Sequence, residues 1–74
     1  MSAFLQFHDH GPSKSGKTRV WGIWSGQPGG YIGEVRWHAH WRRYAFFPND
    51  GTLWDAGCLR EVVAFIDEQM EARR

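Results

Sequence analysis

The spacing of the apolar residues changes along this chain, and the change limits the folds open to it. Up to Pro48, apolar and aromatic residues fall in short runs, and most of the segments between these runs contain glycine or proline. From Cys58 onward they recur every three to four residues, through Val62 and Phe65 to Met70. The first spacing is typical of β-strands and the second of an amphipathic helix. The sequence therefore predicts several strands followed by one helix.

The apolar runs place four strands and one helix. The strands are predicted over Ala3–His8, Arg19–Ser25, Tyr31–His38 and Trp41–Phe47. Between the second and third strands, "QPGG" at Gln27–Gly30 predicts a tight turn, because proline fixes φ and a following glycine accepts positive φ. Asp55 is expected to cap the helix. The order predicts one α+β domain over residues 1–74, a four-stranded antiparallel sheet with a C-terminal helix packed on one face.

The turn positions predict which side chains share a face of the sheet, because opposed residues in paired strands point the same way. With tight turns at Ala39–His40 and Gln27–Gly30, the face toward the helix is expected to carry Val20, Trp24, Val35, Trp37, Tyr44 and Phe46, with Gly22 and Gly33 leaving room for large rings. Ile23 falls on the other face. A slip of one residue would exchange the two faces of a strand.

The face away from the helix is the predicted binding surface, because it mixes tryptophan with arginine. Its expected members are Arg19, Trp21, Glu34, Arg36, His38, Trp41 and Arg43. Tryptophan and arginine dominate protein interfaces, which favours a protein partner. The same residues suit single-stranded nucleic acid, with bases stacking on Trp21 and Trp41 and phosphates meeting Arg36 and Arg43. An ordinary surface, with arginine stems covering the rings, is the third interpretation.

Self-association is also expected from this face. On the predicted register it would leave Trp21, Ile23 and Trp41 in water, which is unusual for a monomer. Two copies meeting through the face, or through an edge strand beside it, would bury these side chains. The charge distribution agrees with an acidic partner or a second copy. The first 49 residues hold six basic against two acidic residues, and the last 25 hold three against six.

Gly11–Thr18, "GPSKSGKT", matches the phosphate-loop pattern G-x-x-x-x-G-K-[ST] at every fixed position. A working phosphate loop joins a strand to a helix, whose N-terminus helps to hold the phosphates. Here Thr18 is followed by a strand pattern, so the segment is predicted to be a lysine-bearing loop. No cofactor is expected.

Two H-x-H pairs, His8 with His10 and His38 with His40, raise a less favoured hypothesis of metal binding. No convincing third and fourth ligand accompanies them. Cys58 lies on the apolar stripe of the predicted helix and is expected to be a buried structural thiol. Nothing else in the sequence resembles a nucleophile with its base, so the protein is predicted not to be an enzyme.

Residues from Gly33 onward resemble a family of very small uncharacterised proteins from phages and bacterial mobile elements. The resemblance rests on "GEVRW", "WRRYAFFP" and "TLWDAGCLREVVAFI", with Trp37, Trp41, Tyr44 and Cys58 among the matching residues. It covers a little over half of the chain. It implies the strand, turn and helix order given above and no activity. The histidines of both H-x-H pairs and the Gly11–Thr18 motif lie outside the shared pattern.

The sequence also indicates where the protein resides. A single cysteine excludes an internal disulfide. The first ten residues lack the basic segment and long apolar run of a signal peptide, and no apolar stretch approaches the roughly 20 residues of a membrane span. A cytoplasmic protein without membrane contact is expected.

Overall fold

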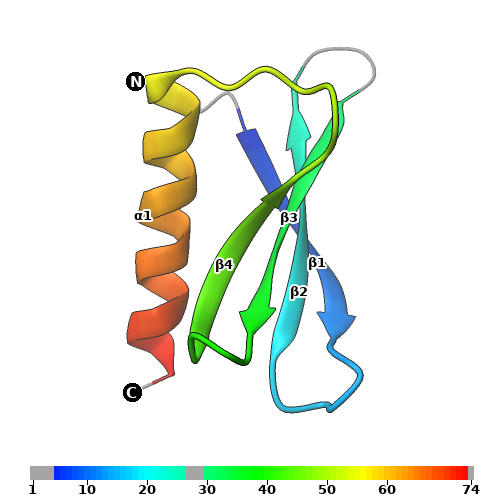
Figure 1. Ribbon diagram of the computed structural model, residues 1–74, viewed down its shortest axis with the longest axis vertical. Helices are drawn as coiled ribbons and strands as arrows, with labels where there is room; N and C mark the ends of the chain where they lie inside the picture. The colour runs from blue at the N-terminus through cyan, green and yellow to red at the C-terminus, as the bar shows by residue number, and fades with distance from the viewer. Residues whose placement is uncertain (1–4, 27–29, 74) are drawn as a thin grey trace.

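The computed structural model describes residues 5–26 and 30–73, and it contains a four-stranded antiparallel sheet and one C-terminal helix (Figure 1). The elements are β1 (Leu5–Pro12), β2 (Arg19–Ser25), β3 (Tyr31–His38), β4 (Arg43–Pro48) and α1 (Ala56–Ala72). The strands lie side by side in chain order, β1-β2-β3-β4. The predicted α+β fold is thus confirmed. Most of the turn predicted at Gln27–Gly30 lies outside the described residues.

The helix begins where the sequence predicts. Asp55 has an extended backbone, and its Oδ1 accepts a hydrogen bond of 2.8 Å from the Cys58 N–H. An N-cap carboxylate of this kind satisfies one of the amide donors that a helix start leaves unpaired. In the described part of the chain, no helix is long and apolar enough to cross a membrane.

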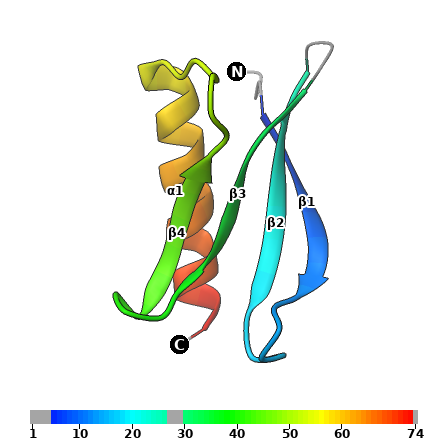
Figure 2. The same ribbon diagram turned by 45° about the vertical axis from the view of Figure 1, so that its right-hand side comes forward.

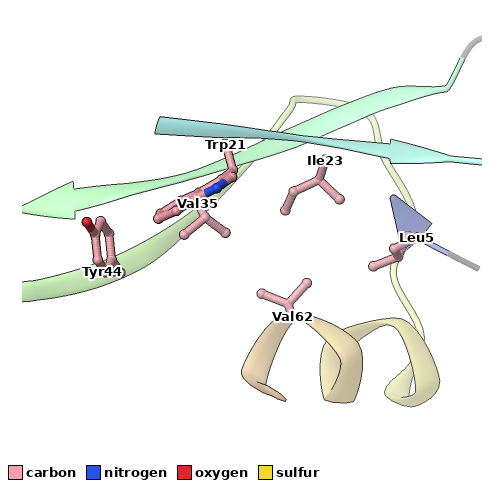
Figure 3. Packing of buried hydrophobic residues seen from close by; sticks show 6 residues of the cluster. All are labelled: Leu5, Trp21, Ile23, Val35, Tyr44 and Val62. Carbon is pink, nitrogen blue, oxygen red and sulfur yellow. The ribbon is translucent and has the colours of Figure 1, made fainter. Parts of the chain in front are cut away.

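The core lies between α1 and one face of the sheet. Val62 points from the helix toward Leu5, Ile23 and Val35, and all four side chains are buried (Figure 3). Around them, Phe65 stacks on Phe7 of β1 at 4.1 Å between ring centres. Such aromatic pairs add large buried areas, which a chain of 74 residues needs to form a stable core.

Polar and charged groups fix the two ends of the helix to the sheet. Near its start, Glu61 Oε1 accepts a hydrogen bond of 3.1 Å from the Leu5 N–H of β1. At its end, the guanidinium carbon of Arg73 lies 4.3 Å from the centre of the Trp37 ring. These contacts attach α1 to β1 at one end and to β3 at the other, so the helix covers one face of the sheet along its length.

The predicted register of β2 is wrong by one residue, which exchanges its two faces. Trp21 pairs with Val35 and Ile23 pairs with Gly33, so both side chains lie in the core, with Trp21 only 9% exposed. The cause is a β-bulge, because Trp24 pairs with Tyr31 and leaves Ile32 of β3 unopposed. Val20 and Trp24, which were expected in the core, therefore belong to the opposite face.

The register of β3 with β4 differs from the predicted register by two residues, and the side chains of both strands still point to the predicted faces. The connection is longer than the expected Ala39–His40 turn, since Trp37 pairs with Tyr44 and His38 with Arg43. Arg42 closes it with a left-handed backbone (φ 58°) and donates its N–H to the His38 carbonyl at 2.8 Å. A shift of two residues preserves side-chain direction, because strands alternate with a period of two.

Candidate functional site

The side of the sheet away from α1 is here called the open face, because no described element covers it. In Figure 2 the helix stands behind β4, and the viewer looks toward this side. Glu34 and Arg36 of β3 lie on it, opposite Phe47 and Ala45 of β4. Its rings, here called the aromatic row, are His8, His10, Trp24, Tyr31, Phe47, His38 and Trp41. They follow one another from β1 across to the β3–β4 turn.

The row begins with four rings near the β2–β3 connection. Trp24 and Tyr31 face each other across β2 and β3, with ring centres 5.0 Å apart. His10 of β1 stacks beside Tyr31 at 6.2 Å, and its imidazole lies over Gly22. A Cβ at Gly22 would collide with that imidazole, so the absence of a side chain there allows His10 to rest on the sheet.

A chain of polar contacts crosses the middle of the face. The hydroxyl of Tyr31 donates to Glu34 Oε2 at 3.0 Å, and Arg36 Nε donates to Glu34 Oε1 at 3.1 Å. The Arg36 guanidinium carbon in turn lies 3.7 Å from the centre of the Phe47 ring. Burial and the hydrogen bond to Glu34 raise the pKa of Tyr31, which keeps its hydroxyl protonated, and therefore a donor, to a higher pH than usual.

The row ends at the β3–β4 turn with stacked rings. His38 stacks on Trp41, with ring centres 4.5 Å apart and planes 10° from parallel. The backbone N–H of Trp41 also donates to His38 Nδ1 at 3.4 Å, which holds the two rings together. Trp41 is 60% exposed and Trp24 is 38% exposed, so each tryptophan offers ring surface to a ligand. Arg43, opposite His38, adds an exposed positive charge beside Trp41.

A shallow hollow of about 530 Å³ opens at the β1 side of this face. It is lined by the rings of His8, His10 and Trp24 and by the small or polar residues Gln6, Asp9, Ser25 and Gly30. Its breadth suits a flat group that lies against Trp24 better than a ligand enclosed on all sides.

Five of the seven residues predicted for the binding surface lie together on or beside the open face: Glu34, Arg36, His38, Trp41 and Arg43. Trp21 and Arg19 do not. Trp21 packs against Phe65 of the helix, and Arg19 donates to Asp9 on the same side of β2. Both predictions were wrong for the same reason, the one-residue shift in the register of β2.

Five rings of the row were not predicted for the binding surface: His8, His10, Trp24, Tyr31 and Phe47. A signal for two of them exists, because Trp24 and Tyr31 stand symmetrically about the segment that joins β2 to β3. Aromatic residues at both ends of a hairpin connection often form a cross-strand pair. His10 had no such signal, since its position depends on the irregular pairing between Asp9 and Pro12.

The Gly11–Thr18 motif forms the end of β1 and the hairpin loop before β2. The Ser13 N–H donates to the Thr18 carbonyl at 2.8 Å, and the Gly16 N–H donates to the Ser13 carbonyl at 2.9 Å. β2 begins directly at Arg19, so no helix N-terminus follows the loop. The motif therefore lacks the strand–loop–helix geometry of a phosphate loop.

The two H-x-H pairs lie on different elements. His8 and His10 are on β1, whereas His38 ends β3 and His40 is in the turn beyond it. Within residues 5–26 and 30–73, no group of three or more histidine, cysteine or acidic side chains comes together as metal ligands would.

Cys58 is half-buried at the start of α1, on the side of the helix that packs against the core. Burial, together with the neighbouring Asp55 carboxylate, raises the pKa of its thiol. A nucleophilic cysteine needs the opposite shift, because the thiolate is the reactive form.

Comparison with known proteins yields no relative. No protein-family model matches the chain, and neither a curated protein nor a solved structure matches it.

Proposed function

We propose that this protein is a non-catalytic binding protein and that its open face binds single-stranded nucleic acid. The observation that carries the proposal is the aromatic row, which exposes Trp24 near one end of the open face and Trp41 at the other end. Bases stack on exposed aromatic rings without regard to sequence, and each stacked base contributes about 1–3 kcal/mol.

The charges beside the row agree with such a ligand. Arg42 and Arg43 are exposed next to Trp41, and Arg36 lies between the two halves of the row. Neutralising two to three phosphates would give a slope of about −1.4 to −2.1 for log affinity against log salt on a single strand. Glu34, already hydrogen-bonded to Arg36, can also accept hydrogen bonds from the amino groups of bases.

A protein partner on this face is less well supported by the side chains. The prediction of a homodimer through it rested on Trp21, Ile23 and Trp41, and the first two of these lie in the core. The middle of the open face holds the Glu34–Arg36 ion pair. The centres of protein interfaces are depleted of charged residues, whereas interfaces with nucleic acid retain them.

Titration of labelled oligothymidylate and oligouridylate, each 20 nucleotides long, tests the proposal. We expect binding at 20 mM salt that weakens with the slope given above. Trp24→Ala and Trp41→Ala should each reduce affinity about 10-fold, which corresponds to one lost stacking contact. Leu53→Ala, which removes another exposed apolar side chain, should have no effect.

Charge provides a second matched pair of variants. Arg43→Ala should weaken binding and lower the salt slope by about 0.7. Lys14→Ala removes the same charge from an exposed position in the loop between β1 and β2 and should change neither. Absence of binding at 20 mM salt, or an affinity that neither tryptophan variant reduces, would contradict the proposal.

A further inference from the structure

A second exposed surface lies on the helix, outside the core. The apolar stripe of α1 is wider than the sheet covers, so Leu59 remains 42% exposed and Val63 57% exposed. These residues are four positions apart and are therefore neighbours on one side of the helix. Leu53, in the segment before the helix, is 95% exposed. The side of α1 that carries Leu59, Arg60, Val63 and Asp67 is called the helix flank below.

Two of the flank residues carry opposite charges. Arg60 and Asp67 are seven residues apart, so they lie on the same side of the helix, two turns from each other. Neither has an oppositely charged residue three or four positions away, which is the spacing of ion pairs within a helix. Among the described residues neither forms an ion pair. Each charge is therefore available to a partner.

We infer that the helix flank binds the same flank of a second copy of this chain, with the two helices antiparallel. A two-fold axis beside Val63 would place Arg60 of one copy opposite Asp67 of the partner subunit, and the symmetry repeats the pair. A parallel arrangement would instead bring Arg60 toward Arg60 and Asp67 toward Asp67. The charges thus select both the partner and its direction.

The side chains near the axis suit a close helix contact. Val63 meets its own copy there, and the small Ala64 beside it lets the backbones approach. Leu59 lies one turn before Val63, so its apolar surface extends the contact toward the helix start. The 17-residue helix is about 25 Å long, so the contact falls below the roughly 1,200 Å² of a standard interface. The dimer should therefore be weak, with dissociation in the range of tens to hundreds of micromolar.

This inference does not depend on the proposed function. The flank belongs to α1, and the open face is the side of the sheet that α1 does not cover. Loss of nucleic-acid binding in Trp24→Ala would leave self-association unchanged. In a dimer, two open faces would be held in one particle, which raises avidity for a long strand.

Sedimentation equilibrium from 20 μM to 1 mM protein in 50 mM salt tests the inference. The wild type should shift from monomer toward dimer across this range. Val63→Glu should weaken association at least 10-fold. Arg60→Asp and Asp67→Arg should each weaken it about 10-fold, because each removes both ion pairs and creates like-charge contacts.

The double variant Arg60→Asp with Asp67→Arg is the decisive one, because it restores both pairs with reversed sign and should regain wild-type association. Glu68→Arg makes the same charge change as Asp67→Arg at an exposed position outside the flank and should leave association unchanged. Far-UV circular dichroism verifies that every variant is folded. A wild type that is monomeric at 1 mM, or a double variant as weak as the single ones, would overturn the inference.

Discussion

Trp21 and Trp24 are three residues apart and have opposite environments. Trp21 packs edge-on against both Tyr44 and Phe65 in the core, whereas Trp24 lies on the open face beside Tyr31. Replacing a buried tryptophan with alanine costs about 3–5 kcal/mol, because it removes the buried area and leaves a cavity. We expect that loss of unfolding free energy for Trp21→Ala and about 1 kcal/mol or less for Trp24→Ala. Urea denaturation measures both losses. A larger loss for Trp24→Ala than for Trp21→Ala would mean that β2 has the register predicted from the sequence, with Trp24 in the core.

Two aspartates make the folded state sensitive to acid. The Arg19 guanidinium lowers the pKa of Asp9, and the Cys58 backbone N–H lowers the pKa of Asp55. A carboxylate with a lowered pKa stabilises the folded state above the unfolded value and loses this effect as pH falls through the folded one. The melting temperature should therefore fall as pH decreases below about 4.

Asparagine variants isolate this effect. The double variant Asp9→Asn with Asp55→Asn should have a lower melting temperature than the wild type at pH 7. The difference should shrink by pH 2.5, where the wild-type carboxylates become protonated. An equal difference at both pH values would show that these carboxylates do not cause the acid sensitivity. Differential scanning calorimetry at the two pH values provides the measurement.

Among the strands, Gly22 and Gly33 differ in what an added side chain would meet. A Cβ at Gly22 would meet the imidazole of His10, which is exposed and can move away. At Gly33 it would lie 3.0 Å from the Phe47 carbonyl oxygen and 3.2 Å from Pro48 Cα, which are backbone atoms of β4. Backbone cannot move aside without separating the paired strands.

Alanine substitutions should therefore affect stability unequally. Gly33→Ala should cost about 1–3 kcal/mol, as overpacking does. Gly22→Ala should change stability by about 0.5 kcal/mol or less, since alanine suits a strand better than glycine and offsets the displacement of His10. Thermal unfolding of the two variants tests the difference. Equal costs would show that His10 is held as firmly over the sheet as the backbone of β4.

The element positions could be predicted from sequence better than their pairing could. The bounds of β2 and β3 are those that the apolar runs predict, and Asp55 caps the helix as expected. The register of β2 was not accessible, because it depends on the bulge at Ile32, and no local pattern marks a bulge. The apolar spacing of the helix also predicted too wide a buried side, since Leu59 and Val63 continue this spacing and yet face solvent.

For the molecule as a whole, these errors decided how much of the candidate site could be predicted. The β3 and β4 residues were assigned to the correct face, because a register shift of two residues preserves side-chain direction. The β2 residues were not, so Trp21 was expected where Trp24 lies. The surface resulting from this exchange is richer in stacked rings and poorer in aliphatic side chains than the predicted one. Its chemistry consequently favours a planar, charged ligand over self-association through the same face.

The central claim is that the open face, and no other surface, binds single-stranded nucleic acid. The most direct test is a ¹H–¹⁵N correlation spectrum recorded while unlabelled oligothymidylate is added to ¹⁵N-labelled protein. We predict shifts of the indole N–H signals of Trp24 and Trp41 and of the backbone amides of Tyr31, Arg36 and Phe47. The indole of Trp21 and the amides of α1 should remain unchanged, because they lie on the other side of the sheet from the ligand. Shifts confined to α1 or to the Gly11–Thr18 loop, or no shifts at millimolar oligonucleotide, would contradict the account.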